Sequence, residues 1–404
     1  MYQALYRKWR PMSFDDVVSQ PHITTTLKNQ IKSGKTAHAY LFTGSRGTGK
    51  TTCARIFAKA INCLDPHDGE PCLECEICKD ADNGTLSDII EIDAASNSKV
   101  DDIRELREGV VYTPERCKYK VYIIDEVHML SAGAFNALLK TMEEPPPHVK
   151  FILATTEIHK VPATIVSRCQ HFDFHRIRNE DIVSRLMYIA SQEGFTLHED
   201  AAGMIARLSD GGMRDALSLL DQCVAYENDI TLDVVSSASG IAGRDYLFDI
   251  LEKIAEKDAA GALRVVDKLY DMSKDLKVLA GELLAQMRNV MIIKTIDNNK
   301  DLITCLPDEY ERLKALAERM KLDEILGDIN TLQECSERFA KSTSKRIELE
   351  MCIIKLCGAA QKAGATAQAA SGNAEITVLL NRITQLENAL KNGAVLQTQP
   401  QIAT

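Results

Sequence analysis

A glycine-rich loop near the N-terminus has the residue types that bind a nucleotide phosphate. The residues that fit G-x-x-x-x-G-K-[ST], with the threonine that follows, are Gly44, Ser45, Arg46, Gly47, Thr48, Gly49, Lys50, Thr51 and Thr52. Glycines let backbone N–H groups turn inward around phosphate oxygens, and the helix that follows adds its positive dipole end. We predict that Lys50 reaches the β- and γ-phosphates of a nucleoside triphosphate and that the Thr51 hydroxyl binds Mg²⁺. A glycine-rich turn that binds nothing is the alternative.

Two carboxylates follow an apolar run further along the chain. Residues 121–124 are apolar enough to form a buried strand, and Asp125 and Glu126 come directly after it. A parallel sheet presents its ligands at the carboxyl ends of its strands. We expect Asp125 to coordinate Mg²⁺ and Glu126 to activate the attacking water. We interpret His128 as structural, because Glu126 already supplies the base.

Another apolar run ends in two hydroxyl side chains, Thr155 and Thr156. A polar group at this strand end is placed to sense a γ-phosphate or to hold the attacking water. The alternative is a strand end whose threonines only satisfy backbone groups.

Two arginines have different settings. Arg168 lies in Ser167-Arg168-Cys169, ahead of an apolar strand. In a protein with a phosphate loop it is a candidate finger acting on a neighbour's nucleotide; otherwise it would be an ordinary surface residue. Arg214 opens a helix directly after Gly211-Gly212, from where it could close over bound phosphates.

Four cysteines cluster after the phosphate-loop helix: Cys63, Cys72, Cys75 and Cys78. Two tight C-x-x-C turns and one nearby cysteine can place four thiolates around a tetrahedral ion, with no open position left for catalysis. We favour structural Zn²⁺ because of the ligand type. An iron–sulfur cluster and free surface thiols are the alternatives. His67 is the only spare ligand nearby.

The composition limits the classes of protein to which the chain can belong. The chain has 404 residues, a formal net charge of −10, one Trp and 12 Cys. The negative charge argues against a protein that coats nucleic acid, but it leaves room for a local basic surface. No apolar run is long enough to span a membrane and residues 1–10 lack a signal-peptide core, so we expect a cytoplasmic protein. The clustered cysteines favour metal over disulfides.

Strands and helices alternate in the first part of the chain. We predict strands at 38–42, 89–93, 121–124, 150–156 and 170–174, and helices at 23–31, 53–61, 100–110 and 132–142. From Asn179 the strand pattern stops, and helices are expected at 181–192, 201–208 and 213–226. Residues 246–356 repeat apolar side chains at helical spacing. A linker follows, with a short amphipathic segment at 376–390.

The chain resembles one family on motifs that occur in a fixed order. They are the phosphate loop, the four cysteines, Asp125-Glu126-Val127-His128, Ser167-Arg168-Cys169 and Gly212-Met213-Arg214-Asp215. Together they are similar to the gamma/tau family of bacterial DNA polymerase III subunits, the clamp-loader ATPases of the AAA+ class. The resemblance covers about Tyr2 to Leu356 and includes Tyr6–Pro11. The cysteine module is its most specific part, because most AAA+ ATPases lack it.

This resemblance implies an α/β fold class and a division of the chain. We expect an AAA+ P-loop domain with a parallel sheet at 1–178, including the zinc module at 63–78. A small helical lid domain would occupy 179–241, an all-helical collar 242–358, and a linker with a short helical tail 359–404. The resemblance also implies a role for each candidate residue. Lys50 and Thr51 would bind phosphate and Mg²⁺, and Asp125 and Glu126 would be the Walker B metal ligand and the water activator. Thr156, with Thr155 as the alternative, would be sensor 1, Arg168 the arginine finger, Arg214 sensor 2, and the four cysteines zinc ligands.

The resemblance also implies partners. The family forms a pentameric spiral from copies of this subunit with delta and delta-prime types, and it uses ATP to load a sliding clamp onto primer–template DNA. Lys99 and Lys140 are candidates to face the DNA backbone. Longer relatives carry further domains that bind the polymerase and the replicative helicase, so that tethering is not carried over to this chain. A polymerase label would describe membership of the holoenzyme, because no polymerase site is recognisable.

Two other functions remain as alternatives. The first is a nucleic-acid helicase or branch-migration motor, for which the Asp125–His128 run is superficially suitable; the Ser-Arg-Cys and four-cysteine motifs argue against it. The second is a non-catalytic scaffold of the same fold. The intact Lys50, Thr51, Asp125 and Glu126 argue against a scaffold.

Overall fold

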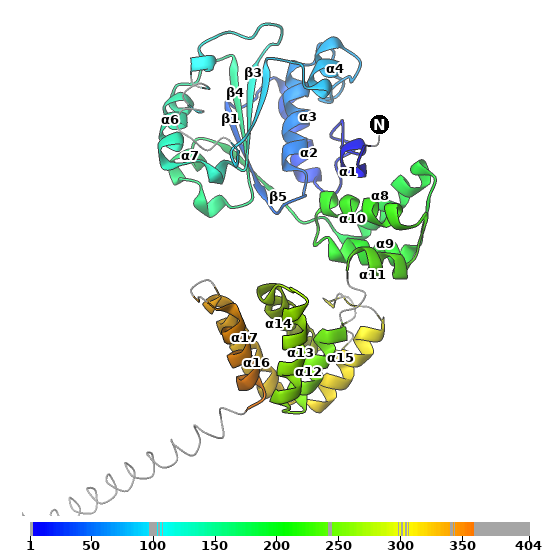
Figure 1. Ribbon diagram of the computed structural model, residues 1–404. Helices are drawn as coiled ribbons and strands as arrows, with labels where there is room; N and C mark the ends of the chain where they lie inside the picture. The colour runs from blue at the N-terminus through cyan, green and yellow to red at the C-terminus, as the bar shows by residue number, and fades with distance from the viewer. Residues whose placement is uncertain are drawn as a thin grey trace, which may run out of the picture. The chain divides into compact units, whose positions relative to one another are not determined.

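The computed structural model describes residues 3–96, 103, 106, 108–240, 245–297, 299, 302, 303, 305, 307–339, 342 and 344–358. The chain forms two compact units, Met1–Ala242 and Gly243–Thr404 (Figure 1). Several sequence predictions lie outside the described residues: Lys99, most of the 100–110 helix, the 376–390 segment and the tail around it.

A five-stranded parallel sheet organises the first unit. Its order is β2-β3-β4-β1-β5. The strands are β1 (Ala39–Gly44), β2 (Ile89–Asp93), β3 (Lys120–Asp125), β4 (Val149–Thr155) and β5 (Gln170–Phe174). Because all five run in the same direction, the residues that follow β1, β3 and β4 meet at one edge of the sheet.

Helices cover both faces of this sheet (Figure 1). The bounds are α1 (Leu5–Lys8), α2 (Pro21–Ser33), α3 (Lys50–Asn62), α4 (Glu76–Asn83), α6 (Ala132–Glu143) and α7 (Ala163–Val166), with short 3-10 turns η1 (Val127–Met129) and η2 (Ile158–Lys160). Apolar side chains alternate along β1: Tyr40 and Phe42 belong to the core under α2 and α3, whereas Leu41 belongs to the core under α6 and α7. This alternation is what a strand buried on both faces requires.

A helical subdomain completes the first unit. Its helices are α8 (Asn179–Glu193), α9 (Glu199–Leu208), α10 (Met213–Tyr226) and α11 (Leu232–Ala238). Two short strands, β6 (Thr196–Leu197) and β7 (Asp229–Ile230), also pair in parallel here, so the prediction that strands stop at Asn179 was wrong. Two residues are too few to give a strand periodicity in the sequence.

All regular elements that the structure describes in the second unit are helices. Its helices are α12 (Asp245–Ala255), α13 (Ala259–Asp271), α14 (Leu276–Thr295), α15 (Pro307–Arg319), α16 (Leu322–Arg338) and α17 (Lys345–Leu356). Each of these helices contributes at least two buried apolar side chains at i, i+3 or i+4 spacing to one core, as Leu313, Leu316 and Ala317 do from α15.

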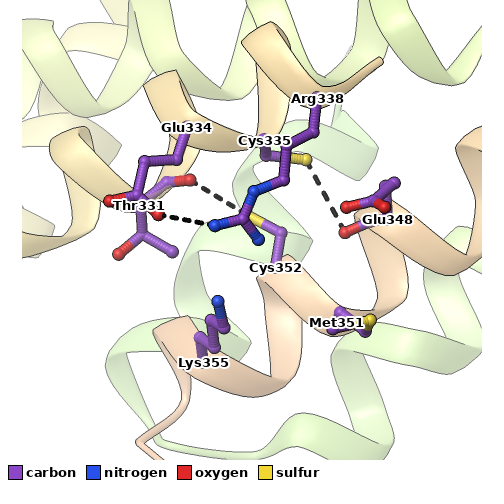
Figure 2. A pocket seen from close by; sticks show the side chains of 8 residues that line it. All are labelled: Thr331, Glu334, Cys335, Arg338, Glu348, Met351, Cys352 and Lys355. Carbon is purple, nitrogen blue, oxygen red and sulfur yellow. Dashed lines mark hydrogen bonds and ion pairs between the residues drawn. The ribbon is translucent and has the colours of Figure 1, made fainter. Parts of the chain in front are cut away.

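A small pocket lies where α16 and α17 pack together (Figure 2). Two thiols cross this contact in opposite directions: Cys335 donates to the Glu348 carbonyl and Cys352 to the Thr331 carbonyl, both at 3.7 Å. Each buried thiol thus contacts a backbone oxygen of the facing helix. These cysteines take part in packing and are not arranged as a ligand set.

Candidate nucleotide site and cysteine cluster

The phosphate loop joins the end of β1 to the start of α3. Gly44 has φ 132°, and a Cβ there would lie 2.2 Å from the Phe174 carbonyl oxygen, so the position requires glycine. The Lys50 Nζ donates to the carbonyls of Gly44 at 2.8 Å and Ser45 at 2.7 Å. Its side chain is therefore held inside the loop. Burial lowers the pKa of Lys50, and the carboxylates of Glu126 and Asp125 oppose that shift.

The two predicted Mg²⁺ ligands meet at the sheet edge. The Thr51 hydroxyl, on the first turn of α3, donates to Asp125 Oδ2 at 2.7 Å. The backbone N–H of Glu126 donates to the other oxygen, Oδ1, at 3.0 Å. Asp125 is the last residue of β3, so strand geometry places its carboxylate beside a helix that begins 75 residues earlier.

Glu126 is held by the residue that directly follows β4, Thr156. It adopts a left-handed backbone conformation, φ 46° and ψ 47°. Its Oε2 accepts from the Thr156 N–H at 3.1 Å and from the Thr156 hydroxyl at 2.9 Å. Thr155 is fully buried, and its hydroxyl accepts from the Glu157 N–H at 3.0 Å. Of the two threonines proposed from the sequence, Thr156 is the one in contact with the carboxylate.

Arg214 lies on the helix that begins beside the phosphate loop. The Met213 N–H donates to the Gly47 carbonyl at 3.0 Å, which joins the start of α10 to the loop. A Cβ on Gly47 would meet the Gly212 Cα at 3.0 Å. The Arg214 guanidinium carbon lies 5.2 Å from the centre of the Tyr6 ring, in cation–π contact. The structure therefore brings Arg214 to the border between loop and helical subdomain.

Arg168 is not brought to the chain's own phosphate loop. Its guanidinium donates to the Thr164 carbonyl at 2.7 Å and pairs with Glu143 at 2.8 Å. It comes just before β5, which pairs in parallel with β1 from Gln170 to Phe174. Arg168 thus lies at the amino edge of the sheet and the phosphate loop at the carboxyl edge. Five residues of strand separate the edges by about 16 Å.

The four clustered cysteines form a compact set of sulfur atoms. All four Sγ atoms lie within 4.8 Å of one another, with Cys63–Cys75 at 4.0 Å and Cys72–Cys78 at 3.9 Å. Zn–S bonds of about 2.3 Å in a tetrahedron require Sγ atoms about 3.8 Å apart, so the set fits the ion. His67 is exposed and pairs with Asp65 instead.

Backbone groups support these sulfurs. The N–H groups of Cys72, Cys75 and Cys78 donate to the preceding sulfur of the set at 3.3 to 3.4 Å. Burial opposes ionisation of Cys75, but hydrogen bonds from Leu64, Cys78 and Cys72 outweigh it and lower the pKa of this thiol to about 7.

Three family descriptions match consecutive parts of the chain. They are "DNA polymerase III, delta subunit" over residues 19–178, "DNA polymerase III clamp loader subunit, ATPase lid domain" over 181–229, and "DNA polymerase III subunits gamma and tau domain III" over 230–371. The chain is 43% identical to the tau subunit of Bacillus subtilis over 391 residues, which cover 96% of this chain and 68% of that protein. It belongs to the gamma/tau family of DNA polymerase III subunits.

Relatives within the gamma/tau family differ in length. The chain is 40% identical to the gamma subunit of Buchnera aphidicola subsp. Schizaphis graminum over 355 residues, 88% of this chain and 98% of that protein. The tau subunit of Escherichia coli is 37% identical over 359 residues, 88% of this chain but 55% of that protein. The chain thus spans nearly all of some gamma subunits and about half of some tau subunits.

Among solved structures, the RuvB Holliday junction branch migration motor of Thermotoga maritima is similar at TM-score 0.45 and 20% identity, over 68% of this chain and 85% of that one. Membership of the gamma/tau family and the match to a clamp-loader ATPase lid domain confirm the predicted family and its class, a clamp-loader ATPase. The five-stranded parallel sheet confirms the predicted α/β fold class. None of the helices that the structure describes has the length and apolar character needed to cross a bilayer.

One residue at the site had no role assigned from the sequence. The Arg10 Nε donates to the Thr52 hydroxyl at 3.1 Å, directly beside the phosphate loop. Burial, followed by the nearby Arg55, lowers the pKa of Arg10 to about 10, so it remains a cation at neutral pH. The signal in the sequence was the Tyr6–Pro11 segment, which resembles the family but contains no pattern that indicates a contact 42 residues away.

Proposed function

We propose that this chain is the ATP-hydrolysing motor subunit of a clamp loader, with Gly44–Thr52 as its nucleotide site. The observation that carries the proposal is the 2.7 Å hydrogen bond between Thr51 and Asp125. It joins the residue after the phosphate-loop lysine to the carboxylate at the end of β3. Both side chains are oxygen ligands suited to Mg²⁺, which when bound neutralises charge on the β- and γ-phosphates.

The remaining residues at this edge have separate tasks in the proposal. Backbone N–H groups of the loop bind phosphate oxygens, and the Lys50 ammonium binds the β- and γ-phosphates. Glu126 takes a proton from the attacking water. Thr156 holds Glu126 in place and is our choice for the γ-phosphate sensor, and Arg214 closes over the phosphates from α10.

We assign Arg168 to the nucleotide of an adjacent subunit. The support is its position at the amino edge of the sheet, opposite the chain's own phosphate loop. Its contacts with Thr164 and Glu143 hold the guanidinium on the surface made by α6 and α7. A finger in this position completes a site only when two subunits meet, so hydrolysis depends on assembly.

We further propose a pentameric assembly with delta and delta-prime type subunits, acting at the replisome on a sliding clamp and primer–template DNA. The support is membership of the gamma/tau family, together with an arginine placed to act outside its own chain. Lys140 is exposed on α6 and is a candidate contact for the DNA backbone.

We also propose that Cys63, Cys72, Cys75 and Cys78 hold structural Zn²⁺. The support is the mutual distance of the sulfurs, which suits a tetrahedral ion, and the chemistry of four thiolates. When bound, the ion cross-links the loop that leaves α3 to the start of α4. A closed shell of four thiolates leaves catalysis to the phosphate loop.

The deciding experiment pairs ATP binding with clamp loading. Lys50→Ala should abolish ATP binding by the full chain and clamp loading by the reconstituted ring, because the ammonium contributes directly to phosphate binding. Lys35→Ala, an exposed lysine outside the loop, is the matched control and should behave as wild type. Normal ATP binding by Lys50→Ala, or strand unwinding by the chain alone without clamp loading, would contradict the proposal.

A further inference from the structure

His128 has contacts that an ordinary core histidine does not need. It lies in η1, directly after β3, with a side chain only 7% exposed. Its Nδ1 is 3.0 Å from the Thr155 hydroxyl and 3.3 Å from Glu126 Oε2. Its Nε2 is 3.3 Å from Glu157 Oε1. One imidazole thus connects the Glu126 carboxylate to the end of β4.

Contacts at both nitrogens orient the His128 ring. The Thr155 hydroxyl accepts from the Glu157 N–H and lies 3.0 Å from His128 Nδ1. The other ring nitrogen, Nε2, faces the Glu157 carboxylate at 3.3 Å. Together these contacts hold the imidazole plane against the strand end.

The same oxygen of Glu126 is contacted from two directions. Thr156 donates to Oε2 through its N–H and its hydroxyl, and the Nδ1 edge of His128 lies beside that oxygen. A glutamate has several rotatable bonds, and contacts from one side alone leave its second oxygen free to swing. With Thr156 on one side and a fixed ring on the other, the direction of the second oxygen, Oε1, is defined.

We propose that His128 is a positioning residue for ATP hydrolysis, which sets the Glu126 carboxylate so that Oε1 faces the attacking water. This rests on the proposed role of Glu126 as water activator. The ring acts through Glu126 and does not touch the nucleotide. It also ties that carboxylate to residues 155–157, so a movement of the β4 end is transmitted to the group that accepts the proton.

The first test separates hydrolysis from binding in the full chain, assembled with its clamp-loader partners. His128→Ala should lower kcat on the order of 10- to 100-fold, because small displacements of a catalytic group are costly, while KM and the affinity for ATP stay within about twofold. His128→Asn keeps a polar atom near the Nδ1 position and should retain more activity than His128→Gln, which keeps one near Nε2. Equal kcat in wild type and His128→Ala would overturn the inference.

The matched control is His159, a second histidine that contacts the Glu157 carboxylate. His159 Nε2 lies 3.4 Å from Glu157 Oε2, from an exposed position 72% accessible to solvent. His159→Ala should leave kcat unchanged. If it lowers kcat as much as His128→Ala does, the effect comes from Glu157 alone and the assignment of His128 is wrong.

A double mutant separates this inference from the proposed function. Glu126→Gln should remove most hydrolysis, and adding His128→Ala should change the residual rate by less than about twofold, because coupled residues do not add. Normal hydrolysis by Glu126→Gln would overturn the role of Glu126 itself. A full additional loss in the double mutant, with Glu126→Gln inactive as expected, would overturn only the route through His128.

Discussion

Carboxyl groups that are partly or fully withdrawn from solvent occur in both units, but those at the sheet edge and Asp328 differ in their hydrogen-bond partners. At the carboxyl edge of the sheet, Asp125 and Glu126 each accept hydrogen bonds from named donors. In the helical unit, Asp328 on α16 is 8% exposed, and its Oδ2 has no hydrogen-bond partner among the described residues. Burial raises the pKa of Asp328 to about 6.

The difference follows from the backbone of each unit. Parallel strands end together, so side chains from distant parts of the sequence gather with donors already in place. Helices of the second unit pack through apolar stripes, and their ion pairs lie at the surface, as for Arg312 with Asp245 and Glu252. We therefore expect substitutions in the first unit to change binding and catalysis, and those in the second to change stability.

The largest effect should come from the cysteine cluster. Cys75→Ser replaces a thiolate with a poor ligand. The zinc content found by metal analysis should therefore fall from about one ion per chain to far below one. The free energy lost is large, since structural zinc binds with about 10 kcal/mol or more in small domains. Hydrogen exchange should rise through α4. Visible absorbance typical of iron–sulfur clusters in the wild type would instead contradict the choice of metal.

The control for this prediction is another cysteine in the same unit. Cys117 lies outside the set of four sulfurs, and its N–H donates to Asp88. Cys117→Ser should retain the full zinc content. Loss of zinc from both variants would show that the module depends on general stability.

The second prediction concerns assembly. Arg168→Ala should leave ATP binding by the isolated chain nearly unchanged and slow hydrolysis in the ring by a factor on the order of 10³, as removal of an arginine finger does in other NTPases. Arg178→Ala, on an exposed arginine that pairs with Asp181, should have little effect. If mutant and wild-type rings hydrolyse ATP at the same rate, Arg168 does not act on the nucleotide of an adjacent subunit.

Only part of the site could be predicted from the sequence alone. The phosphate loop, Asp125 and the strand ends were predictable because each follows an apolar run and parallel strands end together. The contacts of Thr156 with Glu126 and of Arg10 with Thr52 were not, since they depend on side-chain directions between segments that are 30 and 42 residues apart. Asp328 was also missed, because a charged residue on an amphipathic helix is expected at the surface.

The third prediction is that ionisation of Asp328 lowers the stability of the folded chain, the opposite of what carboxyl groups usually do. The pKa of Asp328 is raised from 3.8 to about 6 in the folded chain, so between these values the folded state holds a proton that the unfolded state has released. Stability should therefore fall as pH rises from about 4 to 6 and remain low above. Asp328→Asn should stabilise the protein by about 1 to 3 kcal/mol at pH 7 and by almost nothing at pH 4.

Calorimetric unfolding of the full chain at both pH values checks this. Asp323→Asn, in the first turn of the same helix and exposed, is the control, and it should show no gain at pH 7. A gain from Asp328→Asn that is equal at pH 4 and pH 7 would mean that packing, and not charge, is responsible.

The smallest effect should come from a surface ion-pair network. Arg312 on α15 pairs with Asp245 and Glu252 on α12, both at 3.0 Å, and its guanidinium carbon lies 4.7 Å from the Phe248 ring centre. Exposed pairs contribute about 0.2 to 1 kcal/mol each, and the aromatic contact about as much. Arg312→Ala should therefore increase hydrogen exchange in α12 and α15 by an amount that corresponds to about 1 to 2 kcal/mol, less at high salt, with ATP binding unchanged.

Arg338, whose pair with Glu334 lies within α16, should show less than half of this effect when changed to Ala. Equal effects at the two arginines would mean that bridging two helices adds nothing, and a loss of ATP binding in either would break the contrast between the two units.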